Sequence, residues 1–173
     1  MPVDVRETRF RQWLAEHTGL LFKVVRSFAE GPADSDDLFQ EILLQVWMSL
    51  PSFRDESKPT TWLYRVALNT ALTWKRRETK HRNLRNALSL AFVIEDHAAP
   101  AGGQTNDETV ERMYTAIRGL PPANRALVLL YLDGLSYSEM AEVMGISENN
   151  VGVRLNRIKK QLAQAVKEPS HVA

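Results

Sequence analysis

The sequence contains no cysteine, and only four of its 173 residues are histidines. Structural disulfides and thiolate zinc sites are therefore excluded, because both need the cysteine sulfur. The histidines are scattered without the regular spacing of metal ligands, so we expect no metal site. The absence of cysteine also fits a cytoplasmic protein.

Long apolar runs are missing as well. No stretch reaches the roughly 20 apolar residues that a membrane-spanning helix needs, and the first residues lack the apolar segment of a secretory signal. Hydrophobic residues nevertheless make up 44% of the chain, which is enough for packed cores. We therefore expect a cytoplasmic protein without membrane insertion, built as one domain or two small ones.

The residue combinations of common active sites are also absent. The sequence has no glycine-rich phosphate loop and no serine or cysteine beside a plausible base. Asp36-Asp37 and Asp55-Glu56 are adjacent acids, but their positions favour roles in helix capping and in a loop. We therefore expect no enzymatic activity and no cofactor.

The net charge is only +1, but the charges are unevenly distributed. Residues 30–56 carry seven acids and one arginine, whereas residues 65–85 carry seven cations and one acid. A second basic group follows at residues 154–160. A nearly neutral total therefore conceals one anionic and two cationic patches, each suited to a different partner.

Apolar residues recur near every 3.6 positions through most of the chain, which predicts an all-α fold. We expect one helix to be capped by Asp34, Ser35 or Asp36 and to end near Leu50, and Thr60 or Thr61 to cap the next. The other helices expected before residue 133 cover residues 7–28, 62–85, 108–118 and 123–132.

The composition changes at residues 98–106, where alanine, proline, glycine and small polar residues replace the helical pattern. Such a segment is typical of a flexible linker. The role of residues 87–96 stays open between the first domain and the linker. We predict an all-helical domain at residues 1–90, a linker at 91–107, a second all-helical domain at 108–168 and a tail at 169–173.

Residues 136–151 have the spacing of a helix-turn-helix. Ser136 and Glu139 match a capping box, and Gly145 suits the left-handed residue that ends the first helix. The second helix has the length and shape to enter a DNA major groove, with an inward stripe that begins at Val151. The side chains expected to face DNA are Ser147, Glu148, Asn149, Asn150, Val153, Arg154 and Arg157.

The helix predicted at 62–85 carries a second mixed surface, a stripe formed by Trp62, Arg65, Asn69, Thr73 and Arg76. An aromatic residue, an amide and arginines suit single-stranded DNA, in which bases stack and phosphates pair with cations. In the alternative interpretation, Trp62 belongs to the core and Arg65 is simply solvated.

The helix that ends near Leu50 carries a third surface, opposite its apolar face, formed by Asp37, Gln40, Glu41, Leu44 and Met48. Taken singly, an exposed leucine or methionine means little. Two of them beside carboxylates exceed what solubility needs, so this surface is predicted to dock a protein.

The segments, in this order, resemble the conserved regions of bacterial sigma factors. Residues 36–41 (DDLFQE), Trp47 and residues 61–69 (TWLYRVALN), followed by the basic run, are similar to region two. Residues 120–162, with LSYSEMA and MGIS, are similar to region four. With only these two regions and a short linker, the chain resembles the extracytoplasmic-function group.

The resemblance implies a partner for each surface. The acidic helix would dock on a coiled coil of the largest subunit of core RNA polymerase, and the helix-turn-helix would read the upstream promoter element as duplex DNA. An anti-sigma factor is a further implied partner. The downstream promoter element, as extruded single-stranded bases, would be held by Arg54, Ser57, Lys58, Thr61, Trp62, Arg65, Asn69, Thr73, Arg76 and Arg77.

Three positions depart from the usual family pattern. Gly152 and Val153 replace a lysine and a small hydroxyl residue, which removes a phosphate contact. Glycine here also costs about 1 kcal/mol of helix propensity. Pro59 is unusual in the loop that recognises the downstream element, and we expect it to stiffen that loop.

The sequence therefore predicts a non-enzymatic alternative sigma factor that recruits core RNA polymerase to promoters and helps to melt them. Two alternatives stay open. A regulator that binds only duplex DNA would explain residues 120–162 but would leave the other two surfaces without a purpose. A helical adaptor or sigma-like decoy would bind a regulatory protein and never initiate transcription.

Overall fold

The computed structural model describes residues 3–89 and 108–167. Within these ranges it contains seven α-helices, one short 3-10 helix and no strand, which confirms the predicted all-α fold. None of the described helices is both long enough and apolar enough to cross a bilayer. The predicted linker at 91–107 and the predicted tail at 169–173 lie outside the described residues.

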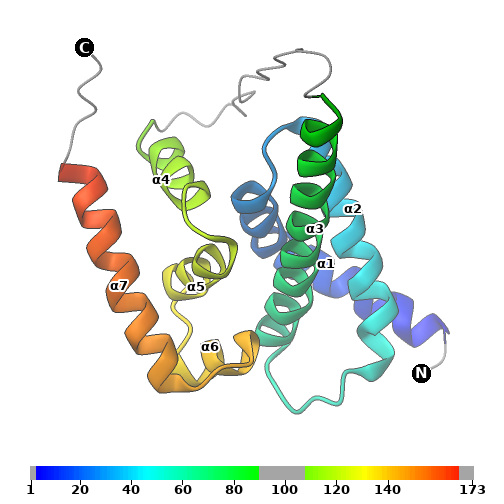
Figure 1. Cartoon of the computed structure of the whole chain (residues 1–173). Helices are drawn as coiled ribbons and strands as arrows, with labels where there is room; N and C mark the ends of the chain where they lie inside the picture. The colour runs from blue at the N-terminus through cyan, green and yellow to red at the C-terminus, as the bar shows by residue number, and fades with distance from the viewer. Residues whose placement is uncertain (1–2, 90–107, 168–173) are drawn as a thin grey trace.

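The first group of helices contains α1 (Val3–Phe28), α2 (Pro32–Ser49) and α3 (Pro59–Ser89), with the 3-10 helix η1 (Leu50–Ser52) after α2. The three α-helices pack on one another (Figure 1) around almost fully buried side chains such as Leu21 and Ile42. Trp13 meets Phe53 and Trp62 edge to face, with ring centroids 4.9 and 5.6 Å away. This aromatic cluster joins α1 to the loop before α3 and to α3 itself.

α1, α2, α3 and α5 (Pro122–Leu132) all begin earlier than predicted, and in α2, α3 and α5 the first residue is a proline. α2 begins at Pro32 after Gly31, without a side-chain cap, so the predicted capping by Asp34, Ser35 or Asp36 is wrong. α3 begins at Pro59, so Thr60 and Thr61 lie inside the helix instead of capping it. Proline is favoured at the first helical position because its missing N–H would have no intrahelical partner there.

The second group contains α4 (Glu108–Arg118), α5 (Pro122–Leu132), α6 (Tyr137–Met144) and α7 (Glu148–Lys167). α6 and α7 form the predicted helix-turn-helix. The Ser136 hydroxyl accepts from the N–H of Glu139, whose carboxylate accepts from the N–H of Ser136. Gly145 is left-handed, with φ of 65°, and the Ser147 hydroxyl accepts from the N–H of Asn150 at 3.3 Å. The capping box, the glycine turn and the second cap are therefore confirmed.

The second group packs against α1 and α3 of the first group (Figure 1). Two arginines of the second group reach the C-terminal end of α1. Arg118 donates to the carbonyl oxygen of Arg26 at 3.2 Å, and Arg125 donates to that of Ser27 at 3.4 Å. Carbonyls at this end of a helix lack intrahelical donors and carry the negative end of the helix dipole. The arginines therefore cap α1 from the other helix group.

Candidate docking and nucleic-acid surfaces

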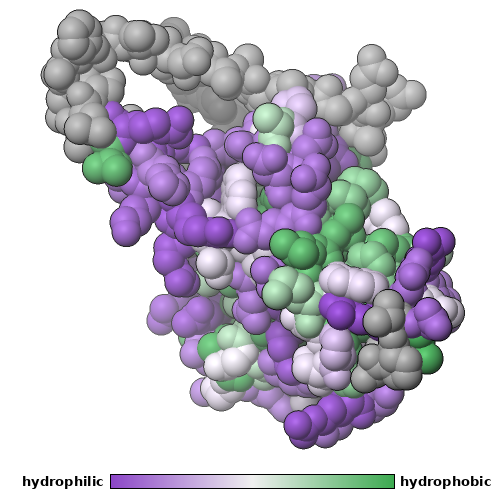
Figure 2. Space-filling view, turned by 90° about the vertical axis from the view of Figure 1, so that its right-hand side faces the viewer, coloured by the Kyte–Doolittle hydropathy of each residue, from purple (hydrophilic) through white to green (hydrophobic). Residues whose placement is uncertain are grey.

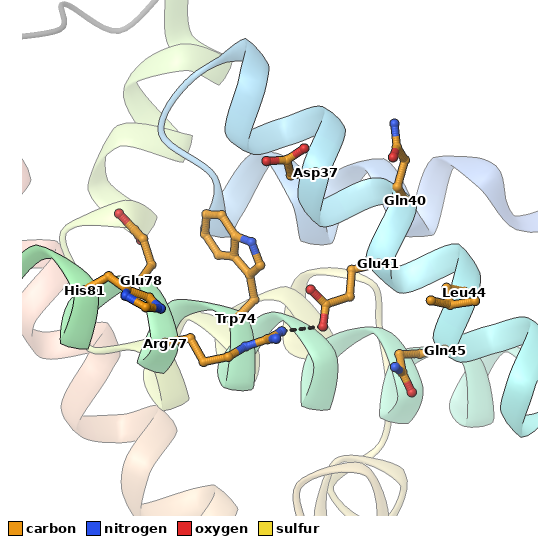
Figure 3. Close-up of a pocket in the computed structure, with 9 residues that line it drawn as sticks. All are labelled: Asp37, Gln40, Glu41, Leu44, Gln45, Trp74, Arg77, Glu78 and His81. Carbon is orange, nitrogen blue, oxygen red and sulfur yellow. Dashed lines mark hydrogen bonds and ion pairs between the residues drawn. The ribbon is translucent and has the colours of Figure 1, made fainter.

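α2 and α3 line an open groove (Figure 3). Met48, one helical turn beyond Leu44, is 61% exposed, and Leu44 itself is 53% exposed. On the side of the molecule where α2 lies, hydrophobic residues gather in a patch surrounded by hydrophilic ones (Figure 2). Four of the five residues predicted to dock a protein line the groove, namely Asp37, Gln40, Glu41 and Leu44.

One ion pair spans this groove, between Arg77 of α3 and Glu41 of α2 (Figure 3). It brings together two predicted surfaces, because Glu41 was assigned to protein docking and Arg77 to single-stranded DNA. α3 also contributes Trp74, Glu78 and His81 to the groove. No local sequence pattern points to these three residues, because their place beside α2 follows from helix packing.

The predicted stripe on α3 is only partly exposed. Asn69, Thr73 and Arg76 are exposed, and Arg65 is half-buried. Trp62 is only 8% exposed and packs against Trp13 and Phe53. The expectation that it lies on an open stripe is therefore wrong, and the alternative that places it in the core is the one observed. Helical spacing alone could not reveal the two aromatic rings that cover it.

The loop before α3 supplies further predicted residues. Arg54 and Lys58 are exposed, Ser57 is half-buried, and Thr61 at the start of the helix is buried. Lys58 Nζ lies 2.8 Å from a carboxylate oxygen of Glu139 on α6. The hydrogen bond from Lys58, together with those from Ser136, lowers the pKa of Glu139 to about 2. This carboxylate therefore stays ionised at neutral pH.

The basic run of α3 divides into structural and accessible cations. Lys75 is buried and donates to Glu30 and Glu78 at 2.7 Å each. Arg82 pairs with the same two acids. The hydrogen bond from Lys75 is the largest cause of the lowered pKa of Glu30. Lys75 and Arg82 thus fasten α3 to the segment after α1, whereas Arg76 remains exposed.

The outward face of the helix-turn-helix is formed by the cap of α7 and its first turns. Ser147, Glu148, Asn149, Val153 and Arg157 are exposed, and Asn150 and Arg154 are half-buried. Arg154 Nε donates to the side-chain oxygen of Asn150 at 3.0 Å, which links these two side chains. The seven residues predicted to face duplex DNA therefore lie together, while Val151, Leu155 and Ile158 are buried as expected.

Gly152 lies beside Tyr137 of α6. A Cβ atom built at Gly152 would be 3.4 Å from a ring carbon of Tyr137, which is an ordinary van der Waals contact. Its backbone is helical and needs no positive φ. The packing therefore leaves room for a small side chain at this position.

Among the described residues, no group of three or more histidines, aspartates or glutamates is arranged to hold a metal ion. The surfaces can act through charge, hydrogen bonds and apolar contact. They comprise the groove between α2 and α3, the cations around the start of α3, and the outward face of α7.

Comparison with known proteins matches both helix groups. Residues 9–81 match Sigma-70 region 2, and residues 110–162 match Sigma-70, region 4. The RNA polymerase sigma-H factor of Pseudomonas aeruginosa is 31% identical over 156 residues, which cover 85% of this chain and 80% of that protein. The ECF RNA polymerase sigma-E factor of Escherichia coli K12 is 30% identical over 145 residues, covering 77% and 74%. The chain belongs to the extracytoplasmic-function sigma factors.

Two solved structures share the fold of this sigma factor. RpoE from Bartonella quintana, in complex with the anti-sigma factor NepR, has a TM-score of 0.70 and 20% identity, covering 94% of this chain and 99% of that chain. CnrH, in complex with the cytosolic domain of CnrY, has a TM-score of 0.66 and 24% identity, covering 95% and 91%. Below, region 2 denotes helices α1–α3 and region 4 denotes helices α4–α7.

Proposed function

We propose that this sigma factor is an alternative initiation subunit. It binds core RNA polymerase in the cytoplasm, directs the enzyme to a specific set of promoters and helps to melt them, with no catalytic activity of its own. The observation that carries this proposal is the presence of region 2 and region 4 in one chain. Each region presents an outward surface whose chemistry suits one of these tasks.

Polymerase docking is assigned to the groove along α2. Its rim carries the carboxylates of Asp37 and Glu41 beside the exposed side chains of Leu44 and Met48. Carboxylates steer a basic partner, and exposed apolar side chains supply the area that is removed from water on binding. A helical partner with basic and apolar side chains therefore fits this groove.

Recognition of the downstream element is assigned to the loop before α3 and the exposed part of α3. Arg54, Lys58, Arg65 and Arg76 offer cations to phosphates, and Asn69 offers an amide to a base edge. Contrary to the prediction, Trp62 does not offer its ring to a base, because the ring is buried and positions the start of α3. Extruding bases costs a few kcal/mol of stacking, so these contacts must offset that cost.

Recognition of the upstream element is assigned to α7. Its first turns present Asn149 and Arg157 outward, and Arg154 is oriented by its hydrogen bond to Asn150. Amides pair well with adenine and arginines with guanine in the major groove. The exposed Lys160 lies further along the helix, where it suits a phosphate.

An anti-sigma factor is the proposed regulatory partner. The solved structures of RpoE and CnrH with the same fold are both complexes, with NepR and with the cytosolic domain of CnrY respectively. A protein that covers the α2 groove would prevent polymerase from docking there. Such a partner would keep this sigma factor inactive until it is released.

The direct test is run-off transcription on a genomic fragment library, using core polymerase with and without this protein. We expect discrete new start sites that share two spaced sequence motifs, one for each region. If no new starts form although the protein still binds duplex DNA, the chain is a duplex-only regulator. If it binds core enzyme or a regulator but no specific DNA, it is an adaptor or decoy.

A further inference from the structure

Region 2 and region 4 meet across an interface whose ion pairs are sorted by sign. Among the described residues, four ion pairs cross the interface, and in each the cation belongs to region 2 and the acid to region 4. The pairs are Lys23 with Asp133, Arg26 with Glu111, Lys58 with Glu139, and Arg65 with Glu142. Region 4 therefore supplies the acid of each of these pairs, while its arginines Arg118 and Arg125 bind backbone carbonyls at the end of α1.

Two of these cations belong to the surface assigned to the downstream element. Lys58 lies 2.8 Å from Glu139, and Arg65 lies 2.5 Å from Glu142. Both acids are on α6, three residues apart, so they project from the same side of the helix about 5–6 Å from each other. α6 packs directly on α3. It thus places two negative charges beside two cations that are assigned to the phosphates of the downstream element.

The pairing of Arg65 is incomplete in this arrangement. One terminal nitrogen of its guanidinium donates to Glu142, but the buried Nε has no acceptor among the described residues. A buried donor without a partner is unfavourable. A phosphate can accept from Nε and from a terminal nitrogen together, in the bidentate geometry that arginine favours. Glu142 therefore leaves one donor of Arg65 unsatisfied, and a phosphate placed to accept from both nitrogens would satisfy it.

The contacts are also of a kind that can be released. The side chain of Lys58 is 74% exposed, and those of Arg65 and Glu142 remain partly open to solvent. Exposed ion pairs contribute little each and are weakened by salt. A polyanion can therefore compete with Glu139 and Glu142 for these two cations.

We propose that α6 acts as an internal mimic of nucleic acid. In the polymerase-free protein, Glu139 and Glu142 occupy the cations that receive the single-stranded downstream element, so region 4 must move away before region 2 can hold extruded bases. The proposal rests on the proposed function, because it uses the assignment of Lys58 and Arg65 to that element.

The first experiment tests whether the closed arrangement exists in solution. A carbodiimide joins an amine and a carboxylate that are in contact, as an amide. In the free protein we expect mass spectrometry to find Lys58 joined to Glu139 and Lys23 joined to Asp133. Binding of core polymerase should reduce both products. If the free protein gives neither product at low salt, the proposal is wrong.

The second experiment tests the masking itself. The double variant Glu139→Gln, Glu142→Gln removes both charges, and glutamine at 139 can still complete the capping box. We expect it to bind a labelled single-stranded oligonucleotide of the downstream element about 3- to 10-fold more tightly than the wild type, as measured by anisotropy. Affinity equal to that of the wild type would overturn the proposal.

A matched control separates masking from net charge. Glu7 and Glu108 each pair with an arginine four residues later in their own helix, away from the interface contacts. The variant Glu7→Gln, Glu108→Gln removes the same two charges, and we expect its oligonucleotide affinity to stay near that of the wild type. An equal gain in this control would show a general charge effect and would overturn the proposal.

A third variant distinguishes failure of this proposal from failure of the assigned function. Lys58→Ala, Arg65→Ala should weaken promoter melting by the holoenzyme. If melting is unchanged, the assignment of these cations to the downstream element is wrong, and the masking proposal falls with it. If melting is weakened but the glutamine variant shows no gain, only the masking proposal is overturned.

Discussion

Region 2 and region 4 hold their helices in place by different means. In region 2 the decisive contacts join distant segments, such as the cluster of Trp13, Phe53 and Trp62 and the pair of Glu30 with Lys75. In region 4 the helix-turn-helix is set by local devices, among them the Ser136 capping box and the left-handed Gly145. The arrangement of region 2 therefore depends on packing between helices, whereas the helix-turn-helix of region 4 depends on its turns.

The largest expected effect is a loss of stability when the aromatic cluster of region 2 is disrupted. Trp62→Ala should lower the free energy of unfolding by about 3–5 kcal/mol, because it leaves a cavity among buried rings. Denaturant unfolding measures this loss, and Thr73→Ala, on the exposed side of α3, should change stability by less than about 0.5 kcal/mol. A small loss of stability with a complete loss of promoter melting would instead return Trp62 to the base-stacking role.

The next prediction concerns the α2 groove. Reversing two charges with Asp37→Lys, Glu41→Lys should weaken binding to core polymerase about 100-fold or more, since like charges then face a basic partner. Co-purification and titration measure the loss, while circular dichroism checks that the fold is retained. Glu7→Lys, Glu108→Lys supplies the same charge change elsewhere on the surface. Normal co-purification of the α2 variant would remove the docking assignment.

A third variant tests whether α7 recognises DNA independently of polymerase binding. Arg154→Ala, Arg157→Ala should weaken binding to the upstream element by about 1–3 kcal/mol for each lost base contact, with polymerase association intact. Lys160→Ala should weaken binding to all duplex sequences alike and should reduce its salt dependence. Unchanged promoter affinity of the arginine variant would exclude α7 as the recognition helix.

Replacing two glycines of region 4, one in a helix and one in a turn, should have opposite effects on stability. Gly152→Ala should stabilise the protein by about 0.5–1 kcal/mol, because alanine favours the helix and a Cβ fits beside Tyr137. Gly145→Ala should destabilise it, because position 145 has φ of 65°. Thermal unfolding measures both shifts. If both variants shift stability in the same direction, the local account of the turn is wrong.

The smallest expected effect is a change in the pKa of Glu139, which depends on a contact between the two regions. The pKa of Glu139 is about 2, below its ordinary 4.5, so its stabilising contribution is complete above pH 4.5 and is lost as pH falls towards 2. Lys58→Ala should raise this pKa towards its ordinary value, because the hydrogen bond from Lys58 is the largest cause of the shift. Carboxyl-carbon NMR follows the titration. An unchanged pKa would place the cause within the capping box alone.

The same contrast explains how much the sequence could predict. The capping box, the left-handed Gly145 and the Ser147 cap are encoded within a few residues of each other, so spacing alone located them. The helix at 108–118 was likewise found with its observed bounds, Glu108–Arg118.

The features that the sequence did not predict are contacts between segments that lie far apart in the chain. The burial of Trp62, the pair of Glu41 with Arg77 and the packing of α6 on α3 all depend on how helices come together. The misplaced starts of α2 and α3 have another cause. There, the side chains able to cap predict later starts, whereas the helices begin at Pro32 and Pro59.

The arginine caps on α1 have a consequence for observing the protein at work. Arg118 and Arg125 donate to the carbonyls of Arg26 and Ser27, and the N–H of Ala29, just beyond the helix, donates to the carbonyl of Val25 at 2.8 Å. In the proposed opening this last turn would lose its caps, so we expect it to fray. Amide hydrogen exchange at the end of α1 should therefore accelerate on polymerase binding. The end of α1 would thus report the opening of the protein without an attached probe.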